Sequence, residues 1–473
     1  MSDKLKLSAS ERIATLLDDS SFVEIGSEVT SRSTDFNEGS IDTPKDGVIT
    51  GYGLIDGKLV YVYSQDASVL GGAVGEMHAK KISAIYNLAM KVGAPVIGLI
   101  DTAGLRLQEA TDALHSFGAL FRKSSMASGV IPQITAVFGN CGGGAAILSA
   151  LSDFTYMVED SKLFVNSPNA IKGNYEDKCD TASASYVSSS TSLVDGVCSN
   201  DNDAILRIRG LVAVLPSNNM EDAVSLCEDD LNRTTPGIEA SKDDAKAVLN
   251  SISDDNLFIE TKADYGKDIV TGFIKLNGAT IAAVANQVNE SKGLISTEGA
   301  DKAASFISFA DSFNIPVLTL TAATGFDATF ESEKTIAKNV AKLSVAFTDA
   351  SVPKVNVVIG DAFGSAYIVM NSKSVGADLV YAWPTARIGI TSPEVAAEIM
   401  YADDIAGADD KVNAIKEAAA KITESQSSAL AAAKRGYVDN IIEPDATRKR
   451  LIAAFDMLAT KREERPYRKH MSF

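Results

Sequence analysis

Two glycine-rich segments decide the fold: Gly139–Ala145, which reads GNCGGGA, and Gly360–Ala366, which reads GDAFGSA. Each segment directly follows an apolar run. An apolar run that enters a glycine-rich turn is typical of a buried strand leading into a helix. The two turns recur in the two halves of a chain of 473 residues, which indicates an internal repeat.

The separation between Gly139 and Gly360 is repeated on both sides of these segments. The same separation relates Thr50 to Thr271, Pro95 to Pro316, Gly104 to Gly325, and Pro132 to Pro353. After a short insertion the separation becomes slightly longer, as between Asp153 and Asp378. A register this constant predicts two related domains. We expect them over residues 1–218 and 263–473, with a connecting seam over 219–262.

Each half has the same predicted order of strands and helices. A β-hairpin comes first, with Asp56-Gly57 and Asn277-Gly278 as the turn dipeptides. The hairpins are predicted over Gly47–Ser64 and Ile269–Ala285, the next helices over His78–Val92 and Ala300–Phe313, and buried strands over Pro95–Asp101, Pro316–Thr321, Gln133–Phe138 and Lys354–Ile359. Strands that alternate with helices predict an α/β fold, so we expect two tandem α/β domains.

Three segments lie outside this pattern. Asn174–Asn202 is polar and serine-rich, which predicts a mobile surface loop, with a lid as the alternative interpretation. Asp409–Arg435 is rich in alanine and lysine and is predicted to be a helix, as is Asp445–Lys461.

Composition and charge disfavour several classes of function. The formal net charge of -18 disfavours a nucleic-acid partner, which needs clustered cations. The four cysteines have no C-x-x-C spacing and there are only three histidines, so we expect no metal site. The first residues lack the apolar core of a signal peptide, and no apolar run reaches the ~18 residues of a membrane helix. We therefore expect a cytoplasmic protein that does not insert into a membrane.

The two glycine-rich turns are the strongest candidates for chemistry. The first N–H groups of a helix have no partner within the helix, and the helix dipole favours negative charge there. Two adjacent N–H groups directed at one point form an oxyanion hole. The alternative is that the glycines only permit close packing of helix against strand. Because the turns recur at matching positions, we favour two anion-stabilising sites.

Other candidate residues have a structural interpretation that we prefer. Asp66 and Asp101 end predicted strands, where aspartates usually cap turns. His78 begins a predicted helix, and Cys141 lies within the first turn, where a small buried residue is expected. Lys91 follows Ala-Met as a biotinylated lysine does, but it ends a predicted helix. Biotin, if used, must therefore arrive on another chain.

A set of motifs spread from Arg12 to His470 points to one family. They are Gln65-Asp66 with Gly71-Gly72 and His78, Gly104–Glu109 (family G-A-R-I-Q-E), Gly139–Ala145 (G-P-C-A-G-G-A), Ala285–Gln287 (A-N-Q), Phe363–Tyr367 (Y-G-G-A-Y), Asp378–Thr385 (ending Y-A-W-P-T) and Arg435–Asp439 (R-G-Y-V-D). These motifs resemble the carboxyltransferase subunits of biotin-dependent acyl-CoA carboxylases, such as propionyl-CoA carboxylase. They are equally similar to the α subunits of sodium-pumping glutaconyl-CoA and methylmalonyl-CoA decarboxylases.

The resemblance implies two crotonase-like domains that pass a carboxyl group between carboxybiotin and the α-carbon of a short acyl-CoA. The amides of Gly143 and Gly144 would hold the thioester enolate oxygen, and those of Ser365 and Ala366 the ureido oxygen of biotin. Substrate contacts would come from Arg106, Gln108, Gly142, Phe326, Tyr367 and Ile368. An apolar residue at position 368 suggests an unbranched or short aliphatic acyl group.

The resemblance also implies partners. Biotin would be carried by a separate carrier protein, and the coenzyme A thioester would be the substrate. The other subunits would be a biotin carboxylase or a membrane decarboxylase subunit. Family members form hexamers, so a homo-hexamer is expected.

This chain departs from the family pattern at three places. Thr324 stands in the family's D-V-P-G-F segment, Asp361 stands where the family has the basic pair of R-K-x-Y-G-G-A-Y, and Thr181–Ser192 replaces E-E-L-G-G-A. Two alternatives therefore stay open. One is a non-catalytic acyl-CoA-binding paralogue. The other is a crotonase-type hydratase or hydrolase, which would need glutamates near the first turn, and Gly139–Leu151 contains none.

Overall fold

The computed structural model describes residues 6–34, 36, 42–172 and 179–466. The chain divides into two compact units, Met1–Ala223 and Val224–Phe473. The division falls inside the expected seam of 219–262, but most of that seam belongs to the second unit. Helix α8 (Ala245–Ile252) and strand β9 (Phe258–Thr261) both pack against β10 of that unit.

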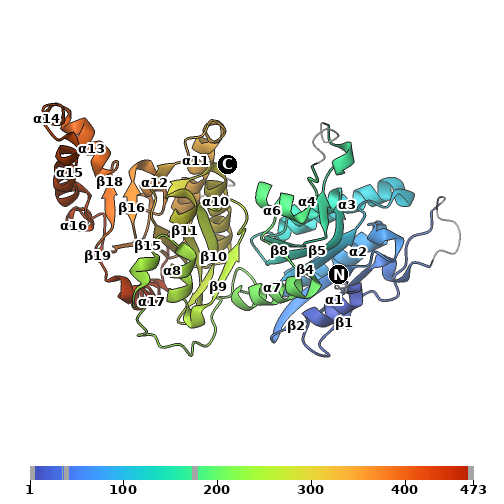
Figure 1. Ribbon diagram of the computed structural model, residues 1–473. Coiled ribbons are helices and arrows are strands. Elements are labelled where there is room, and N and C mark those ends of the chain that lie inside the picture. Colours follow the sequence, from blue (N-terminus) through green and yellow to red (C-terminus); the bar gives the residue numbers. More distant parts are fainter. Residues whose placement is uncertain (1–5, 35, 37–41, 173–178, 467–473) are drawn as a thin grey trace. The chain divides into compact units, whose positions relative to one another are not determined.

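The first unit is built on one sheet with the strand order β1-β2-β3-β4-β5-β6-β8, and β7 pairs with the end of β5. The first three strands are antiparallel, and every later pair is parallel. The strands are β1 (Val23–Glu24), β2 (Val48–Ile55), β3 (Lys58–Gln65), β4 (Val96–Thr102), β5 (Gln133–Gly142), β6 (Phe154–Val158), β7 (Lys162–Phe164) and β8 (Gly196–Cys198). The helices are α1 (Ala9–Leu16), α2 (Glu76–Val92), α3 (Ala110–Ala127), α4 (Gly144–Ala150), α6 (Ala184–Ser190) and α7 (Asp201–Val214), with α2 packed on α3 and α1 on α7 (Figure 1).

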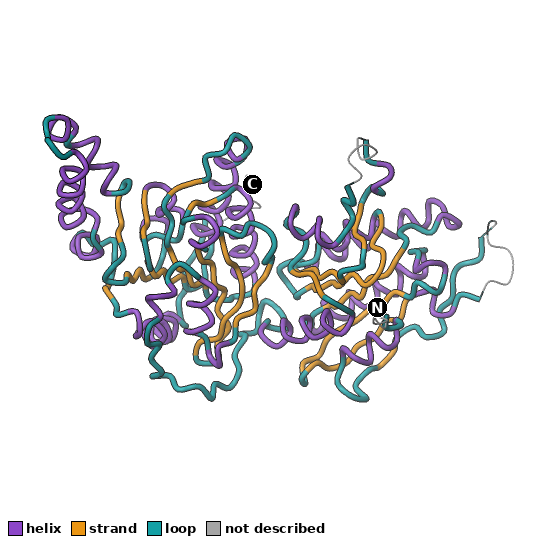
Figure 2. The backbone as a smooth tube through the Cα atoms, viewed as in Figure 1, coloured by secondary structure: helices purple, strands orange, loops and turns teal. Residues whose placement is uncertain are grey.

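The second unit repeats this topology in the order β19-β17-β15-β13-β11-β10-β9. Its strands are β9, β10 (Ile269–Leu276), β11 (Ala279–Asn286), β13 (Val317–Thr321), β15 (Lys354–Val358), β17 (Leu379–Ala382) and β19 (Asn440–Ile441), with two short parallel pairs, β12 (Leu294–Ile295) with β14 (Gly325–Phe326) and β16 (Asp361–Phe363) with β18 (Arg387–Gly389). Its helices are α8, α9 (Val288–Ser291), α10 (Thr297–Ser312), α11 (Ile336–Asp349), α12 (Gly364–Val369), α13 (Pro393–Met400), α14 (Ala402–Ala406), α15 (Lys411–Ile422), α16 (Ala429–Lys434) and α17 (Thr447–Leu458). Strands and helices alternate in both units (Figure 2), so the predicted pair of α/β domains is confirmed.

Both predicted hairpin turns are present and are held in the same way. Every residue of the two dipeptides Asp56-Gly57 and Asn277-Gly278 has a positive φ, as a tight two-residue turn requires. The carboxylate of Asp18 accepts both N–H groups of the first turn, each at 3.0 Å. That of Asp254 accepts both N–H groups of the second, at 3.2 and 2.7 Å. The repeat therefore includes the carboxylates that accept hydrogen bonds from the main-chain N–H groups of the turns.

Carboxylates also fix the starts of equivalent strands. Asp153 exchanges two hydrogen bonds with Gln133 at the start of β5, since its carboxylate accepts the N–H of Gln133 at 2.8 Å and its own N–H donates to the carbonyl at 2.9 Å. Asp378 makes the same two bonds with Lys354 at the start of β15, also at 2.8 and 2.9 Å. Each pairing sets the register between two neighbouring parallel strands, and hence the height at which each strand ends.

Two predictions outside the repeat need correction. The surface loop predicted over Asn174–Asn202 is wrong from residue 183 onward, because Ser183 caps the helix α6 and strand β8 joins the sheet. Val187 of α6 is buried, so this serine-rich helix has an apolar face. Residues 174–178 lie outside the described residues.

The helix predicted over Asp409–Arg435 is interrupted. Helix α15 passes into a π-helical turn over Thr423–Ser427, and α16 starts afresh at Ser428, whose hydroxyl accepts the N–H of Ala431. The helix predicted over Asp445–Lys461 is confirmed as α17. Across the ranges that the structure describes, none of the helices has the length and apolar character needed to cross a membrane.

His78 is a deeply buried titratable group beside the first hairpin. Its Nδ1 lies 2.9 Å from the carbonyl of Asp46, and its Nε2 lies 3.1 Å from the side-chain nitrogen of Gln65. These partners fit a neutral ring in which Nδ1 donates and Nε2 accepts. Burial lowers the pKa of His78 from 6.5 to about 3, so the ring is neutral at physiological pH. The structural role expected for His78 is consistent with these contacts.

We predict that His78 makes the first unit sensitive to acid. Below pH ~6.5 the unfolded chain binds a proton that the folded chain excludes, so stability is lost as the pH falls from ~6.5 toward 3, by roughly 1.4 kcal/mol per pH unit. His78→Gln should lower stability at neutral pH and reduce this slope, as measured by chemical unfolding between pH 7 and pH 5. His115→Gln changes an exposed histidine and should keep the full slope. Equal slopes in wild type and His78→Gln would contradict the assignment.

Candidate active site

The first glycine-rich turn begins later than the sequence suggests. Strand β5 continues through Asn140 and Gly142, because these residues pair with β7. The chain bends at Gly143, which has φ 59° and ψ -122° and directly precedes α4. A side chain is unfavourable at this positive φ, so the bend itself requires glycine. The bend is the point at which the buried strand ends and the helix starts.

The amide of Gly143 is not free to bind a ligand. It donates to the carbonyl of Phe164 at 2.9 Å, which extends the pairing of β5 with β7. The expected role of Gly143 as an oxyanion donor is therefore wrong for this structure. The N–H groups of Gly144 and Ala145 occupy the first two positions of α4, where a helix supplies no acceptor. No side chain of the described residues caps α4, so these two amides form the candidate donor pair.

The second turn has the same construction. Strand β16 ends at Phe363, Gly364 has φ 58°, and α12 follows without a side-chain cap from the described residues. The N–H of Phe363 donates to the carbonyl of Ala323 at 2.8 Å, which ties the turn to the loop after β13. Gly364 is the repeat counterpart of Gly143, and Ser365 and Ala366 are the counterparts of Gly144 and Ala145. The two turns thus present equivalent pairs of amides.

The neighbourhoods of the two turns differ in the space they leave for side chains. A Cβ added to Gly144 would lie 2.9 Å from the ring of Phe117, so glycine is required there. Its counterpart Ser365 is exposed. About one turn further along each helix, Ile147 is 40% exposed and Ile368 is 43% exposed. Each pair of amides is therefore followed in its helix by an exposed aliphatic side chain.

Arg106 is not available as a substrate contact. It is buried, and its guanidinium pairs with the carboxylates of Asp46 and Glu109 and donates to the carbonyl of Ala73 at 2.7 Å. This network holds the loop after β4, whose Gly104 lies against Gly142: a Cβ on Gly104 would be 2.9 Å from the Gly142 oxygen. Arg106 thus positions a loop beside the first turn.

The other predicted substrate contacts have varied surroundings. Gln108 is exposed in the same loop, and its carbonyl accepts from the hydroxyl of Thr34 at 3.0 Å. Gly142 is buried at the end of β5, and Phe326 is half-buried in β14. Tyr367 is half-buried in α12, and burial raises the pKa of its phenol to about 12. Gln108 and Gly142 belong to the first unit, and Phe326, Tyr367 and Ile368 to the second.

The contacts or surroundings of the remaining candidates support the structural interpretation and not a catalytic role. Burial raises the pKa of Cys141 to about 12, so its thiol is not a nucleophile at neutral pH. Asp66 accepts from the N–H and hydroxyl of Ser68, at 3.0 and 2.6 Å. Asp101 pairs with Arg12 at 3.3 Å. Lys91 is exposed in the last turn of α2, not in a hairpin.

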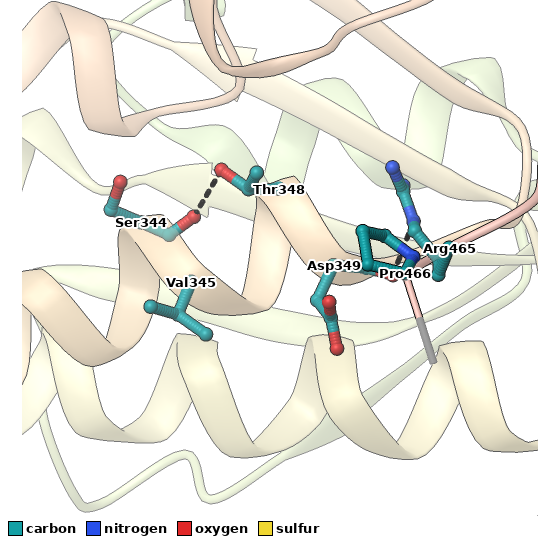
Figure 3. Close-up of a pocket in the computed structure, with 6 residues that line it drawn as sticks. All are labelled: Ser344, Val345, Thr348, Asp349, Arg465 and Pro466. Carbon is teal, nitrogen blue, oxygen red and sulfur yellow. Dashed lines mark hydrogen bonds between the residues drawn. The ribbon is translucent and has the colours of Figure 1, made fainter. Parts of the chain in front are cut away.

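Figure 3 shows a pocket on the second unit that is separate from the turns. It is lined by Ser344, Val345, Thr348, Asp349, Arg465 and Pro466, from α11 and the C-terminal segment. The Nε of Arg465 donates to the Asp349 carbonyl at 2.9 Å, which ties the C-terminal segment to the end of α11. No residue of either turn lines this pocket, so it does not mark the candidate active site.

Comparison with known proteins identifies the family that the chain resembles. Residues 2–473 match the family model described as "Carboxyl transferase domain". The chain is 42% identical to methylmalonyl-CoA decarboxylase subunit alpha of Propionigenium modestum, over 98% of this chain and 92% of that protein. It is 40% identical to the propionyl-CoA carboxylase beta chain of Roseobacter denitrificans, over 98% and 93%.

A solved structure extends the comparison to three dimensions. Transcarboxylase 12S, solved as a hexamer assembly with methylmalonyl-coenzyme A and methylmalonic acid bound, aligns with a TM-score of 0.93 at 35% identity. The alignment covers 99% of this chain and 92% of that one, so both units have the crotonase-like fold that the resemblance implies. The chain belongs to the carboxyl transferase family. It is an acyl-CoA carboxyltransferase, the transferring subunit of a carboxylase or a decarboxylase.

We predict that the bend at Gly143 matters more for activity than for stability. Gly143→Ala places a side chain at φ 59°, where nothing lies within 4 Å of the new Cβ, so only the backbone is strained, at a cost of about 1–3 kcal/mol. The displaced amides should lower carboxyltransferase kcat by roughly 100-fold. Gly57→Ala is a matched control, since Gly57 has φ 79° and equally open surroundings in the hairpin turn. Thermal unfolding should shift similarly in both variants, and equal kcat values would contradict the role of the bend.

Proposed function

We propose that this chain transfers a carboxyl group between biotin on a separate carrier protein and the α-carbon of a short acyl-CoA. The observation that carries the proposal is the pair of uncapped turns at repeat-equivalent positions, each with two amides at the start of a helix. Two anions need to be stabilised in such a transfer, one on the thioester oxygen and one on the ureido oxygen. The chain offers one amide pair for each.

The division of roles follows the family resemblance, with one change in the residues. Gly144 and Ala145 hold the thioester oxygen of the acyl-CoA, and Ser365 and Ala366 hold the ureido oxygen of biotin. Bound biotin supplies or accepts the carboxyl group at its ureido nitrogen. The bare amides and the exposed position of Ser365 fit a neutral, planar ureido group, which offers one carbonyl oxygen as acceptor. Loss of one such donor typically costs ~3–4 kcal/mol of transition-state stabilisation.

Three side chains within the turns or directly beside them, Cys141, Asp361 and Tyr367, do not offer a free base. Cys141 and Tyr367 keep their protons at neutral pH, because burial raises the pKa of each to about 12. The carboxylate of Asp361 is paired with Arg387. These features support a mechanism in which the main chain stabilises charge and the reactants exchange the α-proton between themselves.

The relatives suggest the substrate and the partners. Relatives at 42% and 40% identity are named for methylmalonyl-CoA decarboxylation and propionyl-CoA carboxylation, so we propose methylmalonyl-CoA and propionyl-CoA as the substrate pair. Either direction uses the same amide pairs. A biotin carrier protein, together with a biotin carboxylase or a membrane decarboxylase subunit, would complete the complex. A hexamer like that of transcarboxylase 12S is the proposed assembly.

The test is turnover with free biocytin in place of the carrier. The purified chain is incubated with methylmalonyl-CoA, with and without biocytin, and loss of the carboxyl group is followed by chromatography of the CoA esters. Biocytin-dependent formation of propionyl-CoA supports the proposal. Binding of the CoA ester without turnover would instead indicate a non-catalytic paralogue, an interpretation that the altered residues near Asp361 motivate. Turnover without biocytin would indicate a hydratase or hydrolase.

We predict that Ile368, which the family resemblance makes an acyl contact although its helix also carries the proposed biotin amides, contributes to acyl selectivity. Its exposed aliphatic side chain lies three residues after Ser365 in α12, one turn of helix beyond the second amide pair. Ile368→Asp should disfavour a methyl-bearing acyl group, lowering kcat/KM for methylmalonyl-CoA relative to malonyl-CoA by roughly 10- to 100-fold. Leu430→Asp, on an exposed leucine of α16, serves as the control and should leave the ratio unchanged. An unaltered ratio in Ile368→Asp would remove Ile368 from the acyl site.

A further inference from the structure

Strand β16, which leads into the second turn, is held by an ion pair to a neighbouring strand. Arg387 of β18 lies directly opposite Asp361 of β16 in the parallel register. Its Nε and one terminal nitrogen donate to the two carboxylate oxygens of Asp361, at 2.7 and 2.6 Å. This is the two-bond geometry that arginine forms with a carboxylate, which fixes orientation as well as distance.

The same guanidinium contacts two further parts of the site. Its carbon lies 5.7 Å from the centre of the Phe363 ring, on the same face of β16 as Asp361, because alternate residues of a strand share a face. Its other terminal nitrogen donates to Glu394 in the first turn of α13, at 3.2 Å. Phe363 directly precedes Gly364. Arg387 therefore contacts β16 at both of its ends and connects it to α13.

The matching strands of the first unit, β5 and β7, are not joined by an equivalent ion pair. At the matching register position Asn140 faces Lys162 across β5 and β7. Asn140 carries no charge, and Lys162 forms an ion pair with Asp180. The strands also differ, since β5 runs unbroken to Gly142 whereas the second unit breaks between β15 and β16. A separate strand of three residues has fewer ladder hydrogen bonds to hold it than a continuous strand of ten.

We propose that Arg387 is a positioning residue for the second turn: by pairing with Asp361 it fixes β16 against β18 and so sets the direction of the Ser365 and Ala366 amides. The proposal rests on the proposed function only for its kinetic consequence. Loss of the pair should affect the partner that the second turn holds, which is biotin, and leave the thioester amides of the first turn, Gly144 and Ala145, intact. The side chains are one-third exposed, at 31% and 35%, so the pair contributes geometry more than stability.

The test is a graded series at position 387 in the full-length chain. Arg387→Gln removes the charge, and Arg387→Lys keeps the charge but loses the two-bond geometry. We expect KM for biocytin to rise roughly 10- to 100-fold in Arg387→Gln and less in Arg387→Lys, with KM for methylmalonyl-CoA within about twofold of wild type. Asp361→Asn should reproduce the effect of Arg387→Gln. The double variant should be no worse than either single variant, because both changes break one contact.

A second readout does not depend on turnover. Hydrogen exchange followed by mass spectrometry should show faster exchange over residues 360–369 in Arg387→Gln, with exchange over 139–149 unchanged. Lys334→Met removes an exposed ion pair with Glu331 elsewhere in the second unit, and it should change neither measurement. Equal effects on both KM values, or exchange over 360–369 that matches wild type, would overturn the proposal. Wild-type protein without biocytin-dependent turnover would instead refute the proposed function, and the exchange experiment would still decide the role of Arg387.

Discussion

The geometry of each glycine-rich turn depends on a backbone bend at a single glycine. Gly143 and Gly364 have φ values of 59° and 58°, a region that strongly disfavours side chains. The bend converts the end of a strand directly into the start of a helix, so the next two amides have no acceptor within the helix. On the strand side, the Gly143 amide is already bonded to Phe164. One residue thus separates an amide that is bonded within the sheet from the two amides that begin the helix.

Other polar contacts fix the strands and loops around these bends. Carboxylates satisfy main-chain amides at hairpin turns and at strand starts, as Asp153 does for β5 and Asp378 for β15. Arg106 has a comparable role in the loop beside the first turn. Buried charges cost desolvation energy that their partners only offset, so such groups contribute register and position more than net stability. They set where β5 and β15 end relative to their neighbours. β5 leads directly into the first bend, whereas the short strand β16 lies between β15 and the second.

Most of the fold could be predicted because each element predicted in one half has a counterpart at the same spacing in the other half. Hairpins, strands and the paired turns follow from periodicity and constant spacing. The repeat spacing that relates Gly139 to Gly360 pairs Ser365 with Gly144 and not with Gly143, in agreement with the amide pairs of the structure. Helix α6 was missed because its serine-rich surface obscures a short apolar face around Val187. The contact between Asp361 and Arg387 could not be predicted from the sequence, because it depends on the register of two short strands that are separated by helix α12 and strand β17.

A site built from main-chain amides, as we propose for this chain, can depart from the side-chain pattern of the family and keep its geometry. A fixed cation in the site would attract an anionic ground state as well as a transition state, and uniform binding of this kind does not accelerate the reaction. Neutral amides act most strongly where negative charge develops. Their positions are set by Gly364 and by the hydrogen bond from Phe363 to Ala323. Side chains at positions 361 and 365 can therefore vary, provided that some contact still fixes β16, and in this chain Arg387 supplies that contact from the neighbouring strand.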